Sequence, residues 1–184
     1  AAFSQRQLLQ RMVEFWSDHF TIYLPKVGYL KTIDDRDVIR KHALGRFPDL
    51  LKASAKSPAM LAYLDQTNSR RVAPNQNYPR ELLELHTMGV DGGYTQQDVA
   101  ELSRILTGWT IRGRGEFAFN PAFHDYGPKT FLGRAFPAMD PMNYTNPAGV
   151  TEGEAVLDML VAHPSTARFI ATKLLRFFVW YEPS

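Results

Sequence analysis

Apolar residues recur at helical spacing through most of the chain. Near the N-terminus, the apolar positions from Leu8 to Phe20 follow a period of three to four residues. They come after Ser4 and Gln7, which have the spacing of a capping box. The pattern therefore predicts a first helix that ends near Phe20.

Short helices are predicted through the rest of the first half. After a looser stretch at 21–32, we expect Asp34 or Asp35 to cap a second helix that Gly45 closes. Proline in the first helical turn predicts further helices near 48–56 and 58–65. The turn formers that follow, before the next apolar period, predict a loop.

Two more helices are predicted in the polar-rich centre of the chain. Pro79 is suited to open a helix that Gly89 closes. Thr95 and Asp98 form a capping pattern, with Asp in place of the usual Glu, for a helix that ends at Gly108.

The period then changes from helical to alternating. Trp109 and Ile111 face Phe117 and Phe119 across the sequence RGRG at 112–115, which is typical of a β-hairpin. This is the strongest β signal in the chain.

The remainder is predicted to be an ordered loop followed by two helices. Residues 123–150 lack a regular period but are aromatic, which indicates an irregular ordered stretch with a strand near 130–132. Thr151 and Glu154 then predict a helix to about residue 162, and Ser165 caps a last helix to residue 180.

The composition fits one folded domain spanning 1–184. A chain of 184 residues is long enough for one substantial core and short for two, and its 45% hydrophobic and 22% charged residues are typical of globular proteins. We therefore predict a mainly α, irregular domain of about seven helices with one small β-hairpin near 109–119.

Charge and missing motifs exclude several functions. A net charge of +2 without a run of like charges gives no footprint for nucleic acid. We also predict no membrane span, because no apolar run approaches roughly 18 residues. The absence of cysteine excludes disulfides, thiolate zinc sites and a cysteine nucleophile. The elbow serine, phosphate-loop and dinucleotide motifs are missing too.

The helix predicted from Pro79 carries the first candidate side chains. At about 100° per residue, Glu81 and Glu84 share one side, while His86 lies between Leu82 and Leu83. His86 is therefore expected to be a core histidine. The two carboxylates and this imidazole cannot form one local ligand set.

Glu81 is expected to be buried, because Leu85 and Met88 are its helical neighbours. A buried carboxylate must be paired or protonated. Two interpretations follow: a general base or metal ligand, or a structural ion pair with Arg80 or a more distant group.

His124 and Asp125 in the irregular stretch are the second candidates. A loop histidine beside an aspartate can ligate a metal or act as acid and base, and Lys129 can bind an anion. The alternative is a hydrogen-bonded turn, since adjacent loop side chains usually diverge.

His19 is expected to contact aromatic surface, because Phe15 and Trp16 precede it by four and three residues. Its place near the end of the first predicted helix favours an interaction with the helix dipole.

Several motifs together resemble one bacterial family. NQNYPRELLELHTMGV at 75–90, GYTQQDV at 93–99 and LTGWT at 106–110 resemble the signature of the family DUF1800, as do shorter pieces such as WSDHF at 16–20 and HPSTARFIA at 163–171. Pro79 stands where the family usually has Ala, and Gln76 where it usually has Glu. The resemblance implies that the chain is a fragment of a longer exported protein, located in the periplasm or outside the cell. It implies no activity or cofactor.

Two hypotheses for function remain. The first is a helical binding or scaffolding module whose partner is another protein or the flanking regions of the full-length protein. The alternative is a metal-assisted hydrolase-type enzyme with a divalent metal, for which Glu81, Glu84, His124 and Asp125 are the catalytic and metal-ligand candidates. The deciding observation is whether Glu81, Glu84 and His124 lie around one cavity.

Overall fold

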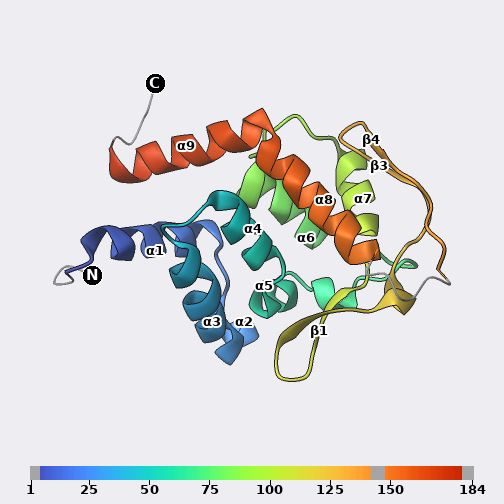
Figure 1. Ribbon diagram of the computed structural model, residues 1–184, viewed down its shortest axis with the longest axis horizontal. Helices are drawn as coiled ribbons and strands as arrows, with labels where there is room; N and C mark the ends of the chain where they lie inside the picture. The colour runs from blue at the N-terminus through green and yellow to red at the C-terminus, as the bar shows by residue number, and fades with distance from the viewer. Residues whose placement is uncertain (1–4, 142–147, 180–184) are drawn as a thin grey trace.

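The computed structural model describes residues 5–141 and 148–179. In these residues the protein is mainly helical, as predicted (Figure 1). The α-helices are α1 (Gln7–His19), α2 (Leu24–Val27), α3 (Tyr29–Asp34), α4 (Phe47–Ala55), α5 (Pro58–Tyr63), α6 (Asn77–Glu81), α7 (Gln96–Ile105), α8 (Ala148–Ala162) and α9 (Pro164–Phe178). Two π-helical segments, η1 (Asp35–Arg40) and η3 (Leu82–Thr87), continue α3 and α6, and two 3-10 turns are η2 (Gln66–Asn68) and η4 (Pro121–Phe123).

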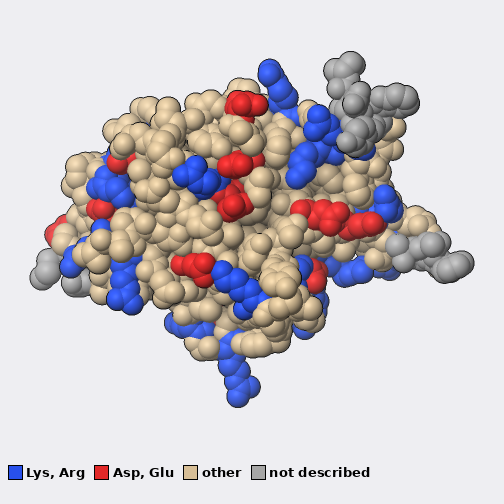
Figure 2. Space-filling model, turned by 180° about the vertical axis from the view of Figure 1, so that it is seen from behind, with Lys and Arg blue, Asp and Glu red and all other residues tan. Residues whose placement is uncertain are grey.

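Helix α8 contacts helices from the early, middle and late parts of the chain. It packs against α4, α7, α9 and η3. Helices α1 and α9 lie at one end of the molecule, and the β-hairpins lie at the other (Figure 1). No helix of the described residues is long and apolar enough to cross a membrane. Basic and acidic side chains are interspersed on the face shown in Figure 2.

The region 21–45 is more helical than predicted. Helix α3 continues without a break into η1, so neither Asp34 nor Asp35 caps a helix. Asp34 is instead buried and accepts a hydrogen bond from the Ser57 hydroxyl at 2.6 Å. The sequence suggested a cap because aspartate is common at helix starts, but here the carboxylate meets a partner 23 positions away.

The predicted hairpin near 109–119 is confirmed. Strands β1 (Trp109–Arg112) and β2 (Glu116–Phe119) pair antiparallel, with Trp109 opposite Phe119. A second hairpin contains the strand expected near 130–132: β3 (Lys129–Phe131) pairs with β4 (Arg134–Phe136).

Trp109 fixes the first hairpin against α8. Its ring is fully buried, and its Nε1 donates a hydrogen bond to the Gly149 carbonyl at 3.2 Å. A Cβ atom at Gly153 would lie only 2.3 Å from the ring atom Cζ2 of Trp109. Glycine is therefore required at this position for α8 to approach the hairpin closely.

The predicted helix starts have mixed outcomes. The capping box of Thr95 and Asp98 is confirmed. Helix α8 begins at Ala148, before the cap that was expected at Thr151. The last helix begins at Pro164, with His163 rather than Ser165 as its cap, because the His163 ring accepts a hydrogen bond from the Ser165 amide. Ser4 and the predicted helix end at residue 180 lie outside the described residues.

Candidate functional site

Three charged or polar side chains meet in the interior where β3 approaches α8. We call His124, Lys129 and Glu152 the His124 cluster. Nζ of Lys129 lies 3.1 and 2.9 Å from the two carboxylate oxygens of Glu152. Nε2 of His124 lies 3.5 Å from the nearer oxygen. The side chains of His124 and Lys129 are 0% exposed and that of Glu152 is 5% exposed, so water screens these charges little.

The His124 ring is held in one orientation. Its Nδ1 lies 2.8 Å from the carbonyl oxygen of Thr107, which places a proton on Nδ1. Phe119 and Tyr126 pack edge-on against the ring. Nε2 faces a carboxylate oxygen of Glu152 at 3.5 Å but makes no hydrogen bond in the described part of the chain.

Asp125 diverges from His124, as expected for neighbours in a loop. Its carboxylate receives two hydrogen bonds from Arg104, at 2.7 and 3.3 Å, and one from the amide of Gly127 at 2.8 Å. Partial burial acts to raise the pKa of Asp125, but these hydrogen bonds outweigh it and the pKa is lowered. Asp125 is therefore an ionised anchor for the loop.

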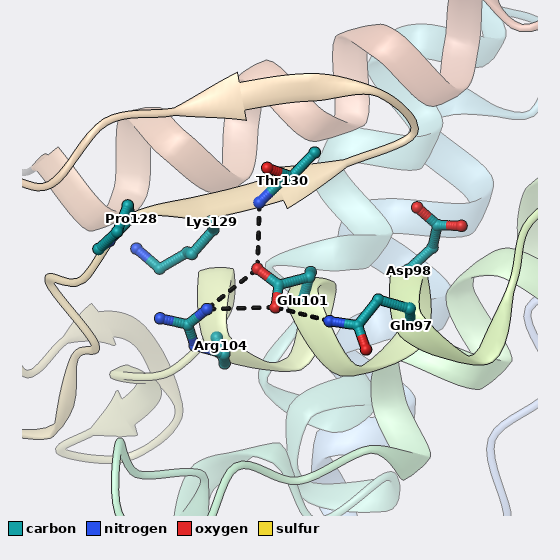
Figure 3. A pocket seen from close by; sticks show the side chains of 7 residues that line it. All are labelled: Gln97, Asp98, Glu101, Arg104, Pro128, Lys129 and Thr130. Atoms are coloured by element: carbon teal, nitrogen blue, oxygen red, sulfur yellow. Dashed lines mark hydrogen bonds and ion pairs between the residues drawn. The ribbon is translucent and has the colours of Figure 1, made fainter.

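Arg104 and Glu101, both on α7, connect this helix to the loop and to β3. Arg104 Nη1 lies 3.0 Å from a carboxylate oxygen of Glu101, and Glu101 also accepts hydrogen bonds from the Thr130 amide and from Gln97 (Figure 3). A cavity of about 410 Å³ lies between α7 and β3. Its lining residues are Gln97, Asp98, Glu101, Arg104, Pro128, Lys129 and Thr130. Glu101 and Arg104 pair with each other, Asp98 accepts hydrogen bonds from backbone amides, and Lys129 pairs with Glu152 in the interior.

Glu81 and Glu84 lie elsewhere, on α6 and η3. Arg80 donates to Gln96 at 2.9 Å and does not form the expected ion pair with Glu81. No hydrogen bond or ion pair within the described residues joins Glu81 or Glu84 to His124 or Asp125. The four candidate residues thus do not form one hydrogen-bonded or ion-paired group.

The expected burial of Glu81 is wrong, whereas that of His86 is confirmed. Glu81 is only half-buried, and its predicted cover, Leu85, is 45% exposed. The π-helical segment has more residues per turn than an α-helix, so the predicted faces rotate out of register. Partial burial, followed by the charge of Glu84, raises the pKa of Glu81, and Arg80 opposes both.

No metal site is assembled by the candidate residues. In the described ranges, no group of three or more His, Asp or Glu side chains is placed to hold a metal ion. His124 and Glu152 approach each other, but the ammonium group of Lys129 already contacts both carboxylate oxygens of Glu152. Lys129 was expected to bind an external anion, and this internal ion pair takes that role.

A second polar cluster, of His19, His86 and Lys173, joins α1, η3 and α9. We call it the His19 cluster. Lys173 Nζ lies 2.9 Å from Nδ1 of His19, whose Nε2 lies 3.1 Å from the carbonyl oxygen of His86. The surrounding rings are those of Phe15, Trp16, Phe20, Phe47 and Phe169.

Both histidines of the second cluster are held neutral. Burial, and then the positive charge of Lys173, lower the pKa of His19 and of His86 to about 3. The expected aromatic contacts of His19 are confirmed, but a charged imidazole acting on the helix dipole is not. Partial burial also lowers the pKa of Lys173.

Sequence reasoning missed Glu152, Arg104 and Lys173. A signal for Glu152 existed: it precedes the buried Val156 and Leu160 by four and eight residues, so it lies on the apolar stripe of α8. A carboxylate on such a stripe requires a buried partner.

Comparison with known proteins adds the family but no biochemical role. No curated protein and no solved structure matches the chain. The model of one family, described as "Protein of unknown function (DUF1800)", matches residues 1–184. This match covers the whole chain, including the motifs at 75–90, 93–99 and 106–110. The chain therefore belongs to the DUF1800 family.

Proposed function

We propose that this chain is a non-catalytic helical module that binds or scaffolds a protein partner. The observation that carries the proposal is the separation of the four candidate side chains. His124 meets Glu152, Asp125 meets Arg104, and the two glutamates of the α6–η3 region lie apart from both. Buried polar groups that satisfy one another stabilise a unique fold, whereas a catalytic site needs groups that converge on a substrate.

The polar networks hold together segments that lack regular structure. Arg104 and Asp125 fix the loop before β3, and Lys129 and Glu152 fix β3 to α8. A rigid frame of this kind presents a defined outer surface, which is what a binding module requires.

We further propose that the protein acts in the periplasm or outside the bacterial cell. The family resemblance supports this, since many members carry export signals. The partner would be another protein or the flanking regions of the full-length chain.

Metal analysis tests the non-catalytic role. The purified protein should contain well under one equivalent of metal, and calorimetric titration with Zn²⁺, Mn²⁺ or Mg²⁺ should show no stoichiometric binding. Glu81→Gln and His124→Asn serve as matched variants. One equivalent of bound metal that both substitutions remove would overturn the proposal in favour of the metal-assisted enzyme.

Cell fractionation tests the location. An antibody against this chain should detect the protein in the periplasmic fraction or the culture medium of the bacterium that makes it. Recovery with a cytoplasmic marker would contradict export.

A further inference from the structure

A stripe of residues on the outward side of helix α9 is polar in its first half and apolar at its C-terminal end. Arg168, Thr172, Leu175 and Val179 follow one another at intervals of four, three and four residues, which places them on one side of the helix. Leu175 is 45% exposed and Val179 is 72% exposed. The neighbouring Phe178 is 43% exposed. Large apolar side chains gathered on one exposed helix face indicate a contact surface.

A cavity of about 380 Å³ lies at the N-terminal end of this stripe. It separates the turn after η3 from α9, and its lining residues are Met88, Gly89, Val90, Asp91, Ser165, Arg168, Phe169 and Thr172. Met88 and Phe169 supply apolar walls, and Arg168 supplies a charge at the helix surface. The cavity is large enough for one bulky apolar side chain.

Local packing fixes the two walls of the cavity relative to each other. The Ser165 hydroxyl donates to the Gly92 carbonyl at 2.9 Å and so ties the start of α9 to the turn. A Cβ at Gly89 would lie 2.9 Å from the Phe169 ring, and φ at Gly89 is +81°, so glycine permits this close approach. The site therefore exists before a partner binds.

The charge of α9 is one-sided. The helix contains Arg168, Lys173 and Arg176 and no acidic residue. Neither Arg168 nor Arg176 forms an ion pair with another described residue, and both are exposed. Asp91 on the turn is the one acidic residue among those that line the cavity, and Arg168 and Arg176 outnumber it. The charge complement of the α9 face is therefore a segment with carboxylates beside its apolar residues.

Two other occupants fit less well. If a second copy paired antiparallel about Thr172, Arg168 of one copy would face Arg176 of the other, and the like charges would repel. A lipid surface would use the exposed apolar side chains and the arginines, but it does not require a preformed cavity for a single side chain.

We propose that the groove formed by α9 and the turn at 88–91 binds an acidic amphipathic helix of a partner protein. One apolar anchor fills the cavity, and carboxylates flanking it pair with Arg168 and Arg176. The stripe from 168 to 179 spans about 16 Å, which corresponds to about three turns of a partner helix. This inference rests on the proposed binding role. It adds the location of the binding surface and the chemical character of the partner.

Selection of peptides tests the inference. A phage-displayed library of helical 16-residue peptides is selected against the 184-residue chain, and the binders are measured by fluorescence anisotropy. We expect apolar residues at helical spacing flanked by Glu or Asp. Hydrogen exchange should show protection at 88–92 and along α9.

Charge reversal provides the sharper measurement. Arg168→Glu should weaken binding of the selected acidic peptides by about tenfold or more, and selection against this variant should favour Lys and Arg instead. Arg114→Glu, at the tip of the β1–β2 hairpin, is the matched control and should change affinity less than twofold. Ala171→Trp, on the exposed side of α9, should block the groove without disturbing the core.

The alternative outcomes separate this inference from the broader proposal. If the selected peptides protect another surface, the binding role stands and this location is wrong. If no peptide is selected, both fail. Sedimentation of the chain as a dimer that Ala171→Trp dissociates would assign the groove to a second copy, and α9-dependent binding to phosphatidylglycerol vesicles would assign it to a membrane. Either result overturns the proposal.

Discussion

The His124 and His19 clusters combine the same side-chain types in opposite ways. Each places a lysine beside a histidine in the interior. In the first, Lys129 contacts both oxygens of Glu152, and His124 also faces that carboxylate. In the second, Nζ of Lys173 lies 2.9 Å from the imidazole of His19 and 5.3 Å from the centre of the Phe169 ring, and it forms no ion pair with a carboxylate of the described residues.

The difference shows that one carboxylate decides how a buried cation is stabilised. Glu152 supplies an opposite charge in a region of low dielectric, where removal of one partner is costly. In the His19 cluster, no carboxylate of the described residues forms an ion pair with Lys173, and Asp18 acts on it only through its charge. This cluster stabilises the fold only while its imidazoles are neutral. The first cluster should therefore be sensitive to substitution and the second to pH.

Glu152→Gln should have the largest effect. It leaves the ammonium group of Lys129 buried without its carboxylate, which we expect to lower the free energy of unfolding by about 3–5 kcal/mol. Urea unfolding at pH 7.5 measures the change. The control is Glu154→Gln on the same helix, where the partly exposed pair with Lys56 should contribute less than about 1 kcal/mol. Equal losses in the two variants would show that the buried ion pair stabilises the fold no more than the partly exposed one.

Acid should destabilise the protein through the His19 cluster. The folded pKa values of His19 and His86 are about 3, below the unfolded value of about 6.5, so the unfolded state binds more protons as the pH falls below 6.5. Each histidine should remove about 2 kcal/mol between pH 7.5 and pH 5.

Unfolding measured at both pH values tests this sign. His86→Gln should reduce the pH dependence by about half. The pKa values of Asp98 and Asp125 are lowered, so their stabilising effect is lost only in more acidic solution, below the window used here. The pKa values of Asp34 and Glu81 are raised, so their protonation opposes the loss of stability as the pH falls. An equal pH dependence in the unsubstituted protein and in His86→Gln would contradict a neutral buried His86.

The double variant Lys129→Met/Glu152→Leu should be less destabilised than Glu152→Gln alone. Both charges are removed together, and apolar replacement of a whole buried ion pair is often close to neutral, so we expect a net loss below about 2 kcal/mol. Urea unfolding of the two variants side by side gives the difference between their free energies of unfolding. A loss equal to or above that of the single variant would mean that His124 depends on the carboxylate.

Lys173→Met should have the smallest effect. Its ammonium group leaves no buried carboxylate behind, so we expect a change below about 1 kcal/mol at pH 7.5. The matched variant Lys129→Met should lower the free energy of unfolding several times more, because it leaves the buried carboxylate of Glu152 without its ion-pair partner. Thermal unfolding of both variants measures the contrast, and a reversed order would refute the comparison on which it rests.

The sequence predicts the local features of this fold better than its distant contacts. The hairpin at 109–119 and the capping box of Thr95 follow from spacing within a few residues, and both are confirmed. The burial expected for Leu85 in η3 was wrong because the i to i+5 hydrogen bonds of a π-helix, such as that from Met88 N to Leu83 O at 2.8 Å, have no simple sequence pattern.

The polar site was predictable only in part. The divergence of His124 and Asp125 follows from their adjacency in a loop. Glu152 pairs with a lysine 23 positions away, and Lys173 meets a histidine 154 positions away. Such pairings depend on how the helices pack, which no local pattern encodes.

The contacts between α7 and the second hairpin also bear on how the protein avoids self-association. A short two-stranded sheet leaves one edge of β3 available for pairing with another chain. Two backbone amides in and just after β3 already donate hydrogen bonds to side chains of α7: Thr130 donates to Glu101 at 3.1 Å, and Leu132 donates to Asp98 at 2.8 Å. Carboxylates of a neighbouring helix thus occupy donors that a foreign strand would need, and β3 is protected from acting as a template for aggregation.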